Sequence, residues 1–241
     1  MPHAAHAATQ ADRATPGLDV VDLGRAAYAD AYEHQVRTQR ALIERRGEPA
    51  ESLGTLFLVE HDPVITVSRR PKAAAHVLAA DAQLRAAGVE RVETDRGGDV
   101  TYHGPGQLVA YPILDLARFG LGLHEYMRLL EGVVIDALAA FGVGGHRDPG
   151  VTGVWVRRGD GSSAKIAAMG VRVRKWVTMH GLALNVDPDL SHFQLIVPCG
   201  LVGRSVTSLR EVLGTGAPGM DDAKREVVAG FERELAERWR S

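Results

Sequence analysis

A glycine-rich stretch between two apolar segments constrains the fold of this chain more than any other feature. It reads Arg96-Gly97-Gly98-Asp99-Val100-Thr101-Tyr102-His103-Gly104-Pro105-Gly106-Gln107. Gly97-Gly98 can enter backbone conformations that other residues avoid, and Pro105 between two glycines fixes a turn. The β-branched and aromatic residues 100–102 predict a short strand between these two breaks. The stretch therefore excludes a continuous helix and predicts two strands joined by a tight turn, the second over residues 108–114.

The same stretch is a candidate binding wall. A floor of glycines lets a ligand lie directly against the backbone, and Arg96 and His103 frame this floor with polar groups. An apolar or acyl ligand fits this description, although a glycine-rich hairpin without a ligand also explains the bare pattern. The dinucleotide-binding fingerprint does not match, because Gly104-x-Gly106 lacks the third glycine and precedes a strand.

The composition is ordinary for a globular protein, with 45% hydrophobic and 24% charged residues among 241. A net charge of −2 gives no general attraction to nucleic acid, and no apolar run approaches the roughly 20 residues that span a bilayer. The single cysteine excludes an internal disulfide and suits a reducing cytoplasm. We therefore expect a cytoplasmic protein without nucleic-acid or membrane partners. The alanine-rich residues 1–16 are expected to be a disordered tail before one domain at residues 17–241.

Apolar periodicity predicts strands and helices that mix without a strict strand–helix–strand repeat. Further strands are predicted at residues 18–23, 55–60, 64–67, 89–93, 152–157, 165–173 and 179–186, and helices at 25–46, 73–78, 81–87, 124–141 and 221–239. Neither an internal repeat nor a long linker divides the chain. The sequence therefore predicts an α/β fold, a single domain with a mixed β-sheet flanked by helices.

Cys199 is a candidate nucleophile because it lies between Pro198, which fixes the backbone, and Gly200, which leaves room beside the sulfur. A buried spectator thiol is an equally good interpretation of the residue pattern. A nucleophilic thiol, with an ordinary pKa of about 8.5, needs a nearby cation to become a thiolate at neutral pH. Lys165 opens an apolar strand and is one candidate, but spacing alone does not select it over other lysines or over a solvated role.

Several motifs in order resemble the octanoyl-(acyl-carrier-protein):protein octanoyltransferases, the lipoate-protein ligase B family. Besides the glycine stretch they are Glu60-His61-x-Pro63-Val64-x-Thr66, Ala164-Lys165-Ile166-Ala167-Ala168-x-Gly170-Val171-Arg172, His180-Gly181-Leu182-Ala183-Leu184-Asn185 and Pro198-Cys199-Gly200. The resemblance covers the chain from residue 18 to the final helix. Ser68, Asp99 and Met169 depart from the usual residues, which are glycine, glutamine or lysine, and isoleucine or leucine.

The resemblance implies the fold of the biotin and lipoate protein ligases and a specific reaction. An octanoyl group would move from acyl carrier protein to a lysine of lipoyl domains, such as those of 2-oxoacid dehydrogenases and the glycine cleavage H protein. By motif, Cys199 would carry the acyl group as a thioester and Lys165 would be its base. No cofactor and no metal are implied, and we expect a monomer.

The resemblance also assigns the acyl-binding wall to three segments. These comprise Arg96, Gly97, Gly98, Asp99, Val100, Thr101, Tyr102 and His103; Ala168, Met169 and Gly170; and Gly181, Leu182 and Ala183. His103, and more weakly His180, would orient the substrate. Two basic clusters are candidate docking surfaces for acidic carrier proteins, although ordinary solvated strand ends explain each single residue. They are Arg69, Arg70 and Lys72, and Arg172, Arg174 and Lys175.

Two other functions remain to be separated from this one. An ATP-dependent lipoate or biotin ligase on the same fold would activate a free acid as an adenylate and would need no cysteine. The chain lacks the Gly-Arg-Gly-Arg-type loop of biotin ligases, and residues 104–107 read Gly-Pro-Gly-Gln where lipoate ligases carry an aspartate. A carrier-docking module without catalysis is disfavoured by the presence of both Lys165 and Cys199.

Overall fold

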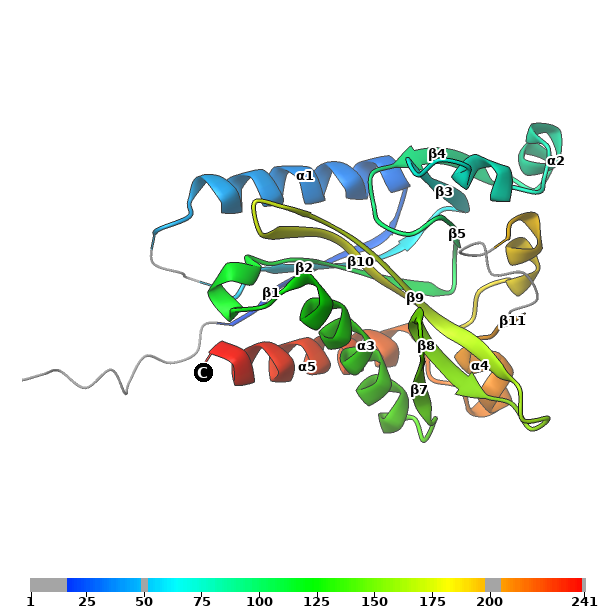
Figure 1. Cartoon of the computed structure of the whole chain (residues 1–241). Helices are drawn as coiled ribbons and strands as arrows, with labels where there is room; N and C mark the ends of the chain where they lie inside the picture. Colours follow the sequence, from blue (N-terminus) through cyan, green and yellow to red (C-terminus); the bar gives the residue numbers. More distant parts are fainter. Residues whose placement is uncertain (1–16, 49–51, 198–204, 240–241) are drawn as a thin grey trace, which may run out of the picture.

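The strands form two β-sheets in the computed structural model, which describes residues 17–48, 52–197 and 205–239 (Figure 1). The larger sheet has the order β1-β2-β6-β10-β9-β8-β7, and a short strand, β11, pairs with β9. Its strands are β1 (Asp19–Ala26), β2 (Thr55–His61), β6 (Gln107–Ile113), β7 (Gly145–Asp148), β8 (Val151–Arg157), β9 (Ser163–Arg174), β10 (Val177–Asn185) and β11 (Ser205–Val206). Because β1 pairs parallel with β2 while β6 and β10 pair antiparallel, the prediction of a mixed sheet is confirmed.

The smaller sheet was not predicted as a separate unit. It has the order β4-β3-β5 and consists of β3 (Val64–Ser68), β4 (Glu90–Thr94) and β5 (Val100–His103). Its own apolar cluster, with Ile65, Val100 and Tyr102, packs beneath a 3₁₀ helix, η1 (Ala73–His76). The glycine stretch therefore connects two sheets instead of forming one hairpin, because β5 pairs with β3 and β6 pairs with β2.

Helices cover both faces of the larger sheet, as Figure 1 shows. One face carries α1 (Tyr28–Glu44), and the other carries α3 (Leu123–Ala140) and α5 (Met220–Trp239). The remaining helical segments are short and comprise α2 (Asp81–Ala86), α4 (Leu209–Leu213), η2 (Leu116–Phe119), η3 (Leu190–Leu195) and η5 (Gly214–Gly216). The helix predicted from residue 25 begins later, because Arg25 and Ala26 still pair with β2. Among the described residues, no helix combines the length and apolarity needed to cross a membrane.

Strand β6 lies at the centre of the core, and all its residues are buried. Leu108 and Ala110 pack into the cluster under α3 and α5, whereas Val109, Tyr111 and Ile113 pack into the cluster under α1. Burial on both faces explains why this strand reads as a continuous apolar run instead of an alternating one. The prediction of a buried strand after the glycine turn is confirmed.

The buried stripe of α1 contains two glutamines as well as apolar residues. Gln35 Oε1 accepts a hydrogen bond from the backbone N–H of His180 at 2.8 Å, and Gln39 Nε2 donates to the carbonyl of Val177 at 2.8 Å. Both glutamines are therefore bound to β10, although Gln35 Nε2 is buried without a hydrogen-bond partner among the described residues. Side-chain hydrogen bonds thus fix α1 over the β9–β10 hairpin.

Candidate active site

A narrow pocket lies where the smaller sheet and the glycine loop meet the larger sheet. It is lined by Tyr28, Arg96, Gly98, Thr101, His103, Val109, Tyr111, Ala168, Met169, Gly170, His180, Gly181, Leu182 and Ala183. The structure thus brings together the three segments predicted to form an acyl-binding wall. Most of the lining side chains are apolar or aromatic, as an acyl chain requires.

Four of the predicted wall residues do not line this pocket. Val100 and Tyr102 point to the opposite side of β5 and belong to the core of the smaller sheet, because successive strand residues face opposite ways. Gly97 and Asp99 instead line a neighbouring groove that also contains Lys165. The sequence motif therefore mixes pocket residues with residues that support the strand.

Two glycines allow the backbone to approach closely around the pocket. A Cβ on Gly170 would lie 2.7 Å from the carbonyl oxygen of Gly97, and one on Gly181 would lie 2.2 Å from that of Ala110. Real Cβ atoms do not approach a backbone oxygen so closely, so any side chain at either position would push the walls apart. Gly170 and Gly181 pair with each other across the β9–β10 hairpin. The width of the pocket depends on this glycine pair.

Arg96 is held across the pocket entrance by the smaller sheet. Its guanidinium donates to the carbonyl oxygen of Thr66 at 2.8 Å and to the Thr66 hydroxyl at 2.9 Å. It also donates to the carbonyl of Gly97 at 3.1 Å. These bonds fix a cation beside the glycine stretch.

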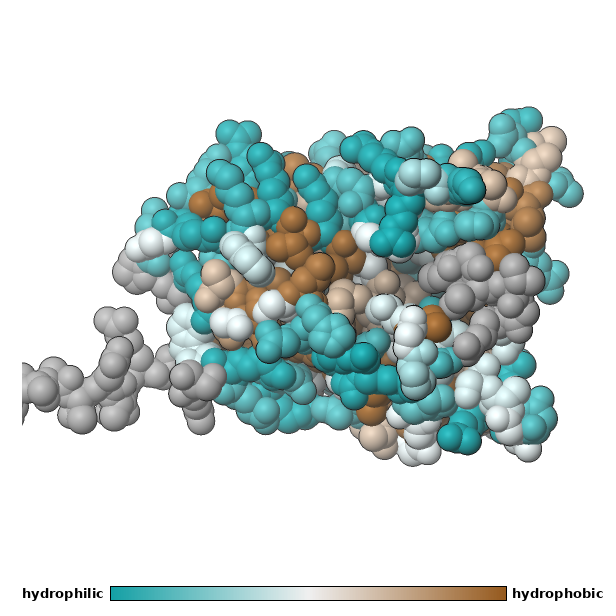
Figure 2. All heavy atoms as spheres, viewed as in Figure 1, coloured by the Kyte–Doolittle hydropathy of each residue, from teal (hydrophilic) through white to brown (hydrophobic). Residues whose placement is uncertain are grey.

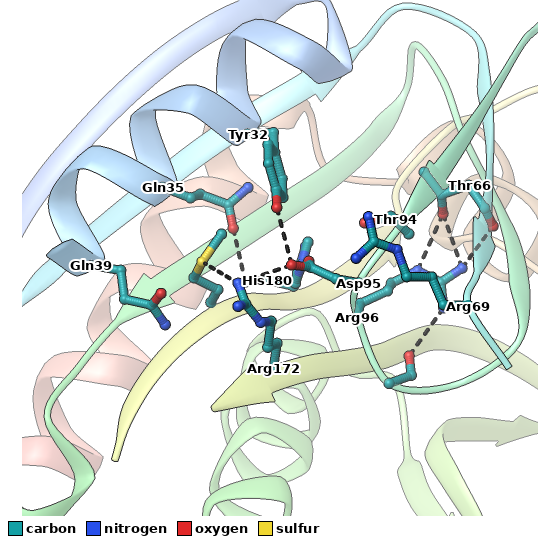
Figure 3. A network of polar contacts seen from close by, with 12 residues as sticks. Tyr32, Gln35, Gln39, Thr66, Arg69, Thr94, Asp95, Arg96, Arg172 and His180 are labelled. Carbon is teal, nitrogen blue, oxygen red and sulfur yellow. Dashed lines mark hydrogen bonds and ion pairs between the residues drawn. The ribbon is translucent and has the colours of Figure 1, made fainter. Parts of the chain in front are cut away.

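A buried polar network around Asp95 joins the glycine loop to α1 and the hairpin (Figure 3). Asp95 Oδ1 accepts from His180 Nε2 at 2.9 Å, and Oδ2 accepts from Arg172 at 2.9 Å and from the Tyr32 hydroxyl at 3.0 Å. The hydrogen bond from His180 and the nearby Arg172 charge hold the pKa of Asp95 down at about 2, against the opposing effect of burial. Asp95 therefore stays ionised, and its hydrogen bonds hold the chain just before Arg96 against β9 and β10.

The histidines around the pocket are neutral at physiological pH. Burial lowers the pKa of His61 to about 4 and that of His103 to about 3, and burial also lowers the pKa of His180. His103 Nδ1 lies 2.6 Å from Gln107 Oε1, and His61 Nε2 lies 2.7 Å from the Tyr111 hydroxyl. Neutral rings fixed by such bonds suit the predicted orienting role of His103 better than a charged role.

Lys165 lies at the start of β9, in a groove next to the pocket. Its side chain is only 7% exposed, and its Nζ donates to the carbonyl of Thr152 at 3.0 Å and lies 4.9 Å from the ring centre of Trp155. Gly153 leaves room for it, because a Cβ there would lie 3.0 Å from Lys165 Cε. The groove and the pocket share Gly98, Met169 and Gly170 as lining residues. Figure 2 shows apolar residues gathered between α1 and α3, over the β9–β10 hairpin to which Met169 and Gly170 belong.

Cys199 lies outside the described residues, which resume on either side of it at Val197 and Ser205. Before it, the backbone N–H of Val197 donates to the carbonyl of His76 at 2.8 Å. After it, β11 runs parallel to β9, with Val206 paired to Lys165, and the N–H of Thr207 donates to the Lys165 carbonyl at 2.9 Å. The chain that follows Cys199 thus returns to the same point of β9 as Lys165.

Three pocket residues were not predicted from the sequence. Tyr28 comes from the first turn of α1, and Val109 and Tyr111 come from β6. The Tyr28 hydroxyl lies 2.7 Å from the hydroxyl of Thr94, so a bond to the smaller sheet fixes its ring. A buried aromatic within an apolar run is the only signal that the sequence offers, and core packing explains that signal equally well. In the described parts of the chain, no cluster of histidine, cysteine and carboxylate side chains could hold a metal ion.

The chain matches the family model described as the lipoyl protein ligase A/B catalytic domain over residues 31–232. It belongs to this family. It is 49% identical over 213 residues to an octanoyltransferase of Chloroflexus aurantiacus, a match that covers 88% of this chain and 91% of the relative. It is 38% identical over 221 residues to an octanoyltransferase of Christiangramia forsetii, covering 89% of this chain and 94% of the relative.

Solved structures of this fold are more distant in sequence. The bi-partite lipoate protein ligase of Thermoplasma acidophilum superposes with a TM-score of 0.68 at 16% identity, covering 93% of this chain and 85% of that one. Lipoate-protein ligase A bound with ATP gives 0.68 at 14% identity, covering 92% and 86%. The biotin protein ligase of Aquifex aeolicus in complex with biotin and ATP gives 0.54 at 15% identity, covering 92% and 72%. These similarities confirm the predicted ligase-like fold.

Proposed function

We propose that this protein transfers an octanoyl group from acyl carrier protein to a lysine of a lipoyl domain. The observation that carries the proposal is the placement of Lys165, a buried cation beside an apolar pocket formed by the three motif segments. The relatives named octanoyltransferase support the same reaction. A buried lysine next to an apolar pocket suits an acyl group that arrives already activated as a thioester.

In the first half of the proposed reaction, Lys165 favours the thiolate of Cys199, which attacks the carbonyl carbon of the octanoyl thioester. The bond from that carbon to the carrier sulfur breaks, and the leaving thiolate takes the proton that Lys165 received from Cys199. One thioester replaces another, so the free energies nearly balance and no ATP is required. The support for the partnership is that β11, which follows Cys199 in the chain, pairs with β9 at Lys165.

In the second half, the amine of the lipoyl-domain lysine attacks the acyl-enzyme carbonyl. The carbon–sulfur bond to Cys199 breaks, and Lys165 moves a proton from the attacking nitrogen to the departing sulfur. The product is an amide, which is more stable than a thioester, so this step runs downhill. Lys165 thus acts alternately as base and acid.

The pocket supplies the affinity for the acyl chain. Val109, Ala168, Met169, Leu182 and Ala183 line it. Each methylene buried there contributes about 0.8 kcal/mol, so an octanoyl tail gains roughly 5 kcal/mol. Hydrogen bonds hold Tyr28 and Tyr111 in place beside the apolar side chains. A pocket with such fixed walls favours acyl chains of a limited length.

The proposal is tested by the mass of the intact protein. With octanoyl carrier protein and no nucleotide, the chain should gain one octanoyl group, and a lipoyl domain should then remove it. The variant Cys199→Ala should fold, gain no mass and transfer nothing. The ATP-dependent ligase is the competing function, and it would give product only from free octanoate with ATP and magnesium. Such a result, without any acyl-enzyme, would replace the transferase by the ligase.

Several finer features stay predictions from the sequence. They are the cytoplasmic location, the monomeric state and the recipients, which we expect to be lipoyl domains of 2-oxoacid dehydrogenases and the glycine cleavage H protein. The prediction of a disordered tail falls on residues 1–16, which lie outside the described residues. A size-exclusion measurement with light scattering tests the monomer directly.

A further inference from the structure

Hydrogen bonds join the loop at residues 68–72 to Gly98 and Asp99 of the glycine stretch. The hydroxyl of Ser68 donates to the carbonyl of Gly98 at 3.0 Å and accepts from the backbone N–H of Arg70 at 3.3 Å. The backbone N–H of Ser68 also donates to the carbonyl of Asp99 at 3.0 Å. Two of these three bonds depend on the Ser68 hydroxyl, and the third is made by the backbone. They hold Arg70 next to the floor of the pocket.

Arg70 and Lys72 are exposed cations without a carboxylate partner in the described part of the chain. The other two cations of this surface are paired, Arg69 with Glu93 at 2.9 Å and Arg91 with Asp81 at 3.8 Å. All four cations line one groove of about 620 Å³. Two positive charges of this groove are therefore available for an external anion.

Arg70 also lines the adjoining groove that contains Lys165. This second groove, of about 500 Å³, includes Gly98 and Met169, which also line the acyl pocket. The acids at this junction already have polar partners, because Glu93 pairs with Arg69 and Asp99 Oδ2 lies 2.7 Å from His76 Nδ1. An anion beside Arg70 therefore lies at the junction of the two grooves, the second of which contains Lys165.

We propose that Arg70 and Lys72 bind the phosphodiester of the phosphopantetheine arm that presents the acyl thioester. This inference rests on the proposed function, because that arm is the donor's link between thioester and protein. The phosphodiester is the single charged group of the arm, while the rest of the arm is neutral. An arginine forms charge-assisted, paired hydrogen bonds to phosphate oxygens, and a lysine adds a mobile charge. The arm then lies along the groove, with its thioester near Lys165 and its acyl chain in the pocket.

The second basic cluster predicted from the sequence does not fit this role. Arg172 is paired with Asp95, while Arg174 and Lys175 lie at the exposed turn between β9 and β10. A strand rises about 3.3 Å per residue, so this turn lies roughly 30 Å along β9 from Lys165. Neither Arg174 nor Lys175 has a carboxylate partner among the described residues, which makes them a matched control for the loss of two exposed charges.

The test compares two small donors that differ only in the phosphate, octanoyl-4′-phosphopantetheine and octanoyl-pantetheine. Transfer to a lipoyl domain is measured for the native chain, for Arg70→Gln/Lys72→Gln and for the control Arg174→Gln/Lys175→Gln. The native chain should prefer the phosphorylated donor about tenfold in kcat/KM, which corresponds to about 1.4 kcal/mol. The first variant should lose most of this preference, and the control should keep it. Salt should weaken the preference in the native chain.

Binding of unacylated 4′-phosphopantetheine and pantetheine, measured by calorimetry, tests the groove even without turnover. The native chain and the control variant should bind the phosphorylated compound more tightly, and Arg70→Gln/Lys72→Gln should not. Failure of octanoyl transfer with normal, Arg70-dependent phosphate binding would overturn the proposed function and leave the groove assigned. A phosphate preference that survives Arg70→Gln/Lys72→Gln would overturn the assignment. The assignment would also be overturned if Arg70→Gln/Lys72→Gln lowered the rate of transfer only with octanoyl carrier protein as the donor. That result would place the two cations against the carrier's protein surface.

Discussion

The β9–β10 hairpin has left-handed backbone at two places, and different forces hold each. At its turn, Lys175 and Trp176 have φ values of 48° and 64°, and both residues are exposed. In the middle of β10, His180 has a φ of 58° and is only 2% exposed. Such a backbone costs a residue other than glycine about 1–3 kcal/mol, so each site needs a compensating interaction.

The left-handed backbone at the turn follows from the short connection between the two strands. The left-handed backbone at His180 is held by contacts from distant parts of the chain. Arg174 pairs directly with Val177, and a type I′ turn, which joins two strands through two residues, has positive φ at both of them. At His180 no turn exists. Its N–H bonds to Gln35 of α1, and its ring bonds to Asp95, the residue before Arg96. The strain at the turn comes from joining β9 to β10 through two residues. The strain at His180 lies in a residue that lines the pocket.

The largest expected difference in activity is between substitutions of two lysines, Lys165 near the start of β9 and Lys175 at the hairpin turn. Lys165→Met removes the proposed acid and base and should reduce octanoyl transfer about 10³-fold, within the range for loss of such a group. Lys175→Met makes the same chemical change at the exposed turn and should leave transfer within about twofold, because no pocket contact is lost. Initial rates with octanoyl carrier protein measure both, and circular dichroism verifies folding. Equal activity of the two variants would remove Lys165 from the mechanism.

The buried histidines around the pocket should also make stability depend on pH, and His61 of β2 is the example. An unfolded histidine binds a proton below about pH 6.5, whereas folded His61 stays neutral down to about pH 4. The unfolded state therefore binds more protons between these values, and the free energy of unfolding should fall as the pH falls. Each such histidine contributes about 1.4 kcal/mol per pH unit over this window. Stability contributed by neutral His61 is thus present above pH 6.5 and lost toward pH 4.

Urea unfolding at a series of pH values measures how steeply the free energy of unfolding changes with pH. His61→Gln should reduce this slope by about 1.4 kcal/mol per pH unit, whereas His124→Gln, at an exposed position of α3, should not change it. An unchanged slope in His61→Gln would mean that His61 is not the neutral buried group described above. The hairpin turn contains no histidine, so the effect belongs to the pocket side.

Glycine substitutions give the smallest effects and compare the two left-handed sites directly. Lys175→Gly relieves strain and loses no buried contact, so it should stabilise the protein by about 0.5 kcal/mol after the entropic cost of glycine. His180→Gly relieves the same strain but leaves Asp95 without its histidine and should destabilise by about 2 kcal/mol. Urea unfolding at neutral pH measures both changes. If both variants were stabilised, the contacts of His180 would contribute less than its strain costs.

Much of the fold was predictable because its signals are local. The continuous apolar run after Gly106 indicated a buried strand, and β6 is buried on both faces. The strands predicted at residues 152–157 and 165–173 correspond to β8 and β9. The ordered motifs gave the family and the three segments that line the pocket. Each of these inferences depends on residues close together in the sequence.

What the sequence by itself determined is therefore the set of elements and the identity of the motif residues. Only the tertiary structure decided which of them face the pocket. Pairing of β5 with β3 turns Thr101 and His103 toward the pocket and Val100 and Tyr102 away from it. Whether β5 joins the larger sheet or a separate one depends on pairing with strands far away in the chain, which local preference does not encode.

The same holds for the residues that complete the site. Tyr28 and Tyr111 reach the pocket because α1 and β6 are packed around it, and Asp95 meets His180 across 85 residues of sequence. The paired state of Arg172 and the unpaired state of Arg70, among the described residues, separated two basic clusters that look alike in the sequence. The sequence specifies the charge and size of each residue, but the residues that it contacts depend on how the whole chain packs.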